Sequence, residues 1–163
     1  MKKNFDLPDS HRVPRLAEVL LKGDSARIEE IFSGVKNGEV IEVWGMILEI
    51  DQPNELELPL LKRSKRERRE LGLISVGETH EVLEGKSYEL DERAVLGTAQ
   101  RLSDGAGPKY FSHTHWDQKR VPTPSSQDLA VFRNLKDGFG YDCRVLSWLP
   151  DNKVFIFRGD KRY

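Results

Sequence analysis

The chain has 163 residues, a length typical of one domain that can bury a core on its own. Its 26 Lys and Arg residues nearly balance 27 Asp and Glu residues, so bulk charge excludes a general attraction to nucleic acid or anionic membranes. The single cysteine, Cys143, excludes an internal disulfide and a Cys-rich zinc ribbon, and its apolar flanks predict a buried thiol.

The sequence also bears on where the protein works. No run approaches the roughly 20 apolar residues of a membrane span. The basic pair Lys2-Lys3 is not followed by an apolar run, so no signal peptide is expected. We therefore expect a cytoplasmic protein without a membrane partner.

The first third of the chain predicts two short helices and a strand. Helical spacing of apolar residues indicates one helix over 14–21 and another after Asp24-Ser25. Residues 40–50 are rich in β-branched and aromatic residues and predict one strand with a bulge at Gly45. Residues 55–69 begin with leucines and become strongly basic, and they are left open between a helix and a loop.

The rest of the chain alternates strands and helices. We expect strands over 71–76 and 79–83, a helix over 91–102 capped by Asp91, and a loop over 103–108. A strand over 109–115, a helix over 126–135 and a hairpin of strands 141–148 and 153–157 follow. This order predicts an α+β fold, with a mixed or largely antiparallel sheet flanked by helices.

Two of the four histidines, His113 and His115, lie two residues apart in a predicted strand. Side chains with this spacing point to the same face, where two imidazoles suit a metal such as Zn²⁺. Asp128, in the first turn of the following helix, would supply a third ligand and leave a fourth position for water. Glu70, at the entry to the strand expected over 71–76, could be the general acid/base of such a site or one more surface charge of the basic segment.

The motif His113-Thr114-His115, followed by Ser125-x-x-Asp128, resembles the signature of JAB/MPN (JAMM) metalloprotease domains. Glu70-Leu71-Gly72 is similar to the glutamate, glycine and apolar strand found upstream in that family. The likeness covers residues 39–163, with 1–38 as an N-terminal helical extension. Trp116 stands where the family usually has proline, and the interval between His115 and Asp128 is longer than usual.

The resemblance implies a mixed sheet of the cytidine-deaminase-like JAB/MPN architecture and a zinc cofactor held by His113, His115 and Asp128. It also implies that Glu70, in preference to its neighbours Glu67 and Glu78, acts as general acid/base and that Ser125 stabilises the oxyanion. The expected activity is that of a peptidase or deubiquitinase-like isopeptidase acting on the C-terminal tail of a ubiquitin-like protein. Residues 1–38 would offer a surface for a protein partner.

Two alternatives stay open at this point. The fold could serve as a non-catalytic binding module, or as a RadC-like protein whose basic run over 62–69 contacts nucleic acid, although the near-zero net charge makes nucleic acid the weaker expectation. Trp116 could be a core residue or line a substrate groove, and Asp117 could support a ligand imidazole or be a surface charge.

Overall fold

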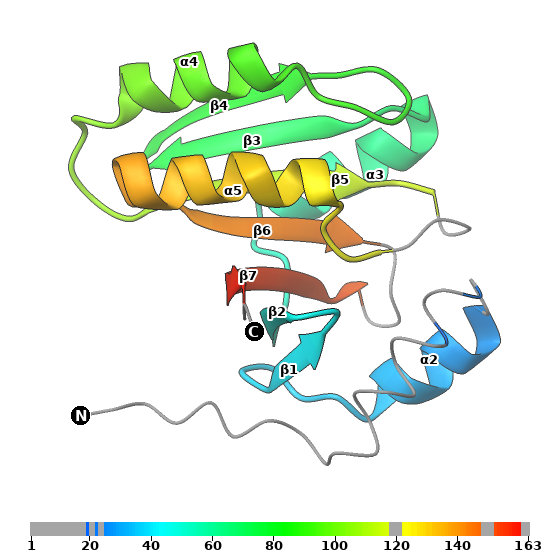
Figure 1. Cartoon of the computed structure of the whole chain (residues 1–163). Helices are drawn as coiled ribbons and strands as arrows, with labels where there is room; N and C mark the ends of the chain where they lie inside the picture. Colours follow the sequence, from blue (N-terminus) through cyan, green and yellow to red (C-terminus); the bar gives the residue numbers. More distant parts are fainter. Residues whose placement is uncertain (1–18, 20–21, 23–24, 118–121, 148–151, 161–163) are drawn as a thin grey trace, which may run out of the picture.

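The computed structural model describes Val19, Lys22 and residues 25–117, 122–147 and 152–160 (Figure 1). The helix expected over 14–21 therefore lies almost entirely outside the described residues, as does His11. The described elements, in chain order, are α2 (Ser25–Ser33), β1 (Val40–Val43), β2 (Met46–Asp51), α3 (Glu57–Glu67), β3 (Leu71–Val76), β4 (Thr79–Glu84), α4 (Glu92–Leu102), β5 (Lys109–His115), α5 (Ser126–Phe139), β6 (Asp142–Ser147) and β7 (Val154–Asp160).

The strands form one seven-stranded sheet in the order β1-β2-β7-β6-β5-β3-β4. β5 and β6 run parallel, and the other neighbouring pairs are antiparallel. A parallel pair needs a crossover connection, which α5 supplies between β5 and β6. The predicted α+β fold with a mixed sheet is confirmed.

The helices cover both faces of the sheet (Figure 1). α4 and α5 pack on one face, where Phe111 of β5 meets Phe132 of α5 with ring centroids 6.0 Å apart. α3 packs on the other face against β3, β5 and β6. In α2, Ile28 and Phe32 are buried in the larger core cluster, and Phe32 contacts Phe155 of β7. Residues before position 39 thus share this core, while the boundary at 38 stays a prediction.

The expectation of one bulged strand over 40–50 is wrong. The chain folds back at Trp44 and Gly45, and β1 pairs antiparallel with β2 through the register Val43↔Met46. Trp44 has φ 52° and Gly45 has φ 78°, the two positive values of a tight hairpin turn. Propensity missed this turn because tryptophan is typical of strands and rare where φ is positive.

The basic segment left open between helix and loop is the helix α3. Leu60 and Leu61 are buried against the sheet, while the basic residues face outward. Arg63 and Arg69 form ion pairs with Glu67 and Glu84. The basic run is therefore partly neutralised by its neighbours, which weakens the case for phosphate binding.

Several local predictions are confirmed. The Asp91 carboxylate caps α4 by accepting from the Arg93 N–H at 2.9 Å. Helix α5 begins where expected but runs past Leu135 to Phe139, and Gly140 ends it with φ 78°. Cys143 is buried, and burial raises the pKa of its thiol.

Among the described residues, no helix is long and apolar enough to cross a membrane.

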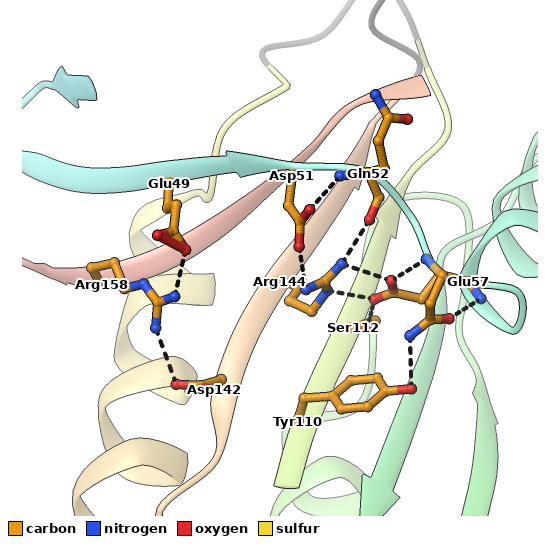
Figure 2. Close-up of polar contacts among 10 residues, drawn as sticks. Glu49, Asp51, Gln52, Glu57, Tyr110, Ser112, Asp142, Arg144 and Arg158 are labelled. Atoms are coloured by element: carbon orange, nitrogen blue, oxygen red, sulfur yellow. Dashed lines mark hydrogen bonds and ion pairs between the residues drawn. The ribbon is translucent and has the colours of Figure 1, made fainter. Parts of the chain in front are cut away.

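The buried Glu57 carboxylate links α3 to strands β5 and β6. Figure 2 shows the Arg144 guanidinium of β6 facing the Glu57 carboxylate at the start of α3, with Nε–Oε2 and Nη2–Oε1 distances of 2.7 and 2.9 Å. The Ser112 hydroxyl of β5 donates to the same carboxylate. Glu57 is fully buried, so its charge is balanced inside the protein. The Ser112 contact thereby ties β5, the strand that carries both histidines, to α3.

Candidate metal centre

The two histidines lie on the opposite face of β5 from this ion pair. Ser112 and Thr114 point toward α3, where the Thr114 hydroxyl lies 2.7 Å from the Ser64 hydroxyl. His113 and His115 therefore point together toward α5, and their ring centroids are 5.1 Å apart. His113 is buried and His115 is partly buried. The predicted pairing of the two imidazoles on one face is confirmed.

The Ser-x-x-Asp motif forms the N-terminal cap of α5. The Ser125 hydroxyl oxygen accepts from the Asp128 N–H at 3.1 Å, and Asp128 Oδ2 accepts from the Ser125 N–H at 3.0 Å. This reciprocal capping box fixes the Asp128 carboxylate at the helix end nearest the histidines. Asp128 Oδ1 lies 3.2 Å from His113 Nδ1, and Oδ2 lies 3.1 Å from His115 Nε2.

Glu70 reaches the same cluster from the entry of β3. Its backbone is fixed by hydrogen bonds with Lys86 and Gly85, both 2.8 Å long. Its carboxylate is buried and contacts His113 Nε2. Of the alternatives, Glu67 pairs with Arg63 of α3 and with Arg69 just after the helix, and Glu78 is exposed in the turn at the far end of β3. Among the three glutamates, the structure brings Glu70 to the histidines.

These side chains can hold a metal ion. Glu70, His113 and His115 each offer a ligand atom, and these atoms lie within 4.8 Å of one another. Asp128 also contacts both histidines. Donor atoms in a tetrahedral site with bonds of about 2.0–2.1 Å are separated by roughly 3.3 Å. The Asp128–histidine distances of 3.2 and 3.1 Å match that separation, but they involve different oxygens of Asp128, Oδ1 for His113 and Oδ2 for His115.

The two nitrogens of His113 face different carboxylates. A metal can take one nitrogen, and the other then keeps its carboxylate partner, as is usual for metal-bound histidines. Asp128 contacts both imidazoles, whereas the contact of Glu70 is with His113. A metal on Nδ1 would have Asp128 beside it, and a metal on Nε2 would have Glu70 beside it.

The cluster concentrates negative charge around His113. Burial lowers the pKa of His113, but the facing Asp128 and Glu70 carboxylates outweigh burial and raise it to about 10. Burial acts to raise the pKa of Asp128, but the two imidazoles hold it well below its usual range. The two carboxylates therefore favour a cation between them, which a proton or a metal ion can supply.

A cavity of about 630 Å³ opens over the cluster. It is lined by the four cluster residues and by Ser125, whose oxyanion role stays a prediction. Trp116, whose role the sequence left open, also lines this cavity. Asp117 accepts a hydrogen bond from the Tyr88 hydroxyl at 3.1 Å, a contact that the sequence did not indicate.

Sequence reasoning missed two aromatic lining residues, Trp44 and Tyr88. Trp44 was assigned to the middle of a strand, and Tyr88 belongs to the short segment between β4 and α4. The turn chemistry of Gly85 and Ser87 marks that segment as a loop, but no local pattern places it at the cavity.

Comparisons with protein-family models, with curated proteins and with solved structures find no match.

Proposed function

We propose that this protein is a zinc-dependent peptidase or isopeptidase of the JAB/MPN type, acting on the C-terminal tail of a ubiquitin-like protein. One observation carries the proposal. Glu70 before β3, the two histidines of β5 and Asp128 at the start of α5 converge in one cavity. Their order along the chain resembles the motif order of that family, and the cytidine-deaminase-like architecture is part of the proposal.

In this proposal, His113, His115 and Asp128 hold the zinc. Two imidazoles and one carboxylate are a donor set typical of hydrolytic zinc sites. Bound zinc supplies a Lewis acid for the scissile carbonyl and for the attacking water.

Glu70 moves the proton in this scheme. Its buried carboxylate lies beside His113 but outside the proposed ligand set. It can accept a proton from the attacking water and deliver it to the leaving nitrogen. Glu70→Gln should therefore keep the metal and lose turnover.

Ser125 acts on the developing negative charge. Its hydroxyl oxygen accepts from the Asp128 N–H, so its own hydrogen is available for another acceptor. In the cavity, that hydrogen can be donated to the carbonyl oxygen as it becomes an oxyanion. Ser125→Ala should lower kcat by roughly 10²–10³-fold, as for other oxyanion donors, and should also weaken the cap of α5.

The first experiment is metal analysis of protein purified without chelators or a histidine tag. We expect about one zinc per chain in the wild type, little in His115→Ala and Asp128→Asn, and an unchanged content in Glu70→Gln. Glu78→Gln is the matched control, because Glu78 is an exposed glutamate in a turn.

Each other outcome has a defined meaning. Loss of zinc in Glu70→Gln but not in Asp128→Asn would make Glu70 the ligand and remove it as the proton carrier. A folded wild type that neither contains nor takes up zinc would contradict the hydrolase proposal. If zinc is present, cleavage of ubiquitin-like proteins with C-terminal extensions then tests the substrate.

A further inference from the structure

Beside the metal centre, the cavity has a preformed aromatic wall. Tyr88 and Trp116 stack with ring centroids 5.4 Å apart and ring planes at 19°. The Trp116 indole N–H donates to the Ser87 carbonyl at 2.5 Å, and the Tyr88 hydroxyl donates to Asp117. Tyr88 nevertheless keeps 48% of its surface exposed. A ligand side chain would meet rings that are already held in place, which lowers the entropic cost of binding.

Another exposed aromatic residue, Trp44, lines the same cavity from a different part of the fold. Trp44, at the tip of the β1–β2 hairpin, is 44% exposed and has the left-handed φ of 52°. Asparagine or glycine is the usual residue in such a turn. An exposed tryptophan in an unfavourable backbone conformation gains little for folding, and such residues cluster at ligand clamps. The position of Trp44 at the cavity therefore points to binding.

Outside the metal cluster, the charge of the described lining residues is mainly negative. Glu89, Glu92 and Asp117 line the cavity together with one lysine, Lys22. Lys86 approaches Glu89 at 3.8 Å, but both side chains are more than half exposed, so this pair is weak. Carboxylates next to aromatic faces favour a cationic side chain over a neutral or an anionic one.

We propose that this aromatic and acidic part of the cavity binds a lysine or arginine side chain of the substrate next to the reacting bond. The inference rests on the proposed peptidase function and specifies its substrate. The aliphatic part of the side chain packs on the rings, and its charge meets the carboxylates. A purely apolar side chain would pack on the rings, but it would displace water from the carboxylates without offering them a hydrogen bond or an opposite charge.

The test measures binding separately from cleavage. Fluorescent glycine-serine hexapeptides carry lysine at one position, moved along the series, and are matched by peptides with norleucine or glutamate at that position. Norleucine has the aliphatic chain of lysine without its charge. Anisotropy titrations use the zinc-supplemented Glu70→Gln protein, in which cleavage is blocked. We expect the best lysine peptide to bind roughly tenfold more tightly than its norleucine match, and the glutamate peptide to bind most weakly.

Two variants locate the preference. Asp117→Asn should reduce the lysine-to-norleucine ratio, and Trp116→Ala should weaken both peptides. Glu78→Gln, remote from the cavity, should leave both affinities unchanged. The peptide series is measured on the Glu70→Gln protein, which keeps Trp116 and Asp117. It therefore remains decisive even if Trp116→Ala fails to fold.

The outcomes separate this inference from the proposed function. Equal binding of lysine and norleucine peptides, tighter binding of norleucine, or no binding of any lysine peptide would overturn the basic-residue specificity. Zinc-dependent cleavage with no such preference would overturn it while the peptidase proposal stands. A lysine preference in a protein without zinc or cleavage would overturn the peptidase proposal and keep the binding site.

Discussion

Removing the Arg144 guanidinium should cost much of the stability of the fold. Arg144→Met keeps most of the side-chain volume but leaves the fully buried Glu57 carboxylate without its cation. Two charge-assisted hydrogen bonds, 2.7 and 2.9 Å long, are lost at once. At about 1.5–3 kcal/mol for each bond to a charged group, the two bonds sum to about 3–6 kcal/mol. Breaking a buried ion pair typically costs about 3–5 kcal/mol, which is the loss we expect.

The assay is urea unfolding at pH 7, followed by tryptophan fluorescence. Adding Glu57→Gln to Arg144→Met should recover part of the loss, because the uncompensated charge is then gone. Figure 2 also shows the matched control, Arg158, which pairs with Glu49 and Asp142 nearer the surface. Arg158→Met should cost about 1 kcal/mol or less. A loss below 1 kcal/mol for Arg144→Met, equal to that of the control, would show that the Arg144 charge does not stabilise the buried Glu57 carboxylate.

Three further predictions concern single positions. The Thr123 hydroxyl is buried and has no hydrogen-bond partner in the described structure, so Thr123→Val should leave the free energy of unfolding unchanged or raise it by about 1 kcal/mol; a clear loss would reveal a missed partner. Gly77 has φ +59°, and a Cβ there would lie 2.4 Å from the Ala106 carbonyl oxygen, so Gly77→Ala should lower the melting temperature. Gly138 lies within α5 with no atom within 4 Å of an added Cβ, so Gly138→Ala should raise the melting temperature. Burial raises the pKa of the Cys143 thiol above the value of about 8.5 for a thiol in the unfolded chain. The contribution of the protonated thiol to the free energy of unfolding should therefore be complete below about pH 8.5 and should decline as the pH rises further. Denaturant titrations across pH 7–10 on the wild type and Cys143→Ala test this, and rapid labelling of the native thiol at pH 8 would contradict it.

Features that depend on near neighbours in the chain could be predicted from the sequence. Alternation along β5 places His113 and His115 on one face whatever the rest of the fold does. The Asp91 cap and the hairpin of β6 and β7 likewise follow from turn chemistry and strand propensity. Trp44-Gly45 shows the limit, because a turn that needs positive φ was hidden by a residue typical of strands.

The tertiary structure decided which distant groups meet. Three glutamates near β3 were comparable in sequence, and the register Gly72↔His113 places the segment containing Glu70 next to the histidines. Helix α5 carries Asp128 across the same face, and Trp44 comes from the opposite end of the sheet order from β4. Strand pairing and helix packing depend on contacts between residues far apart in the chain, because burying the apolar faces of all elements together selects the arrangement. The sequence by itself determined the candidate ligands and their local geometry. The pairing of β3 with β5 decided which of the three glutamates lies next to His113.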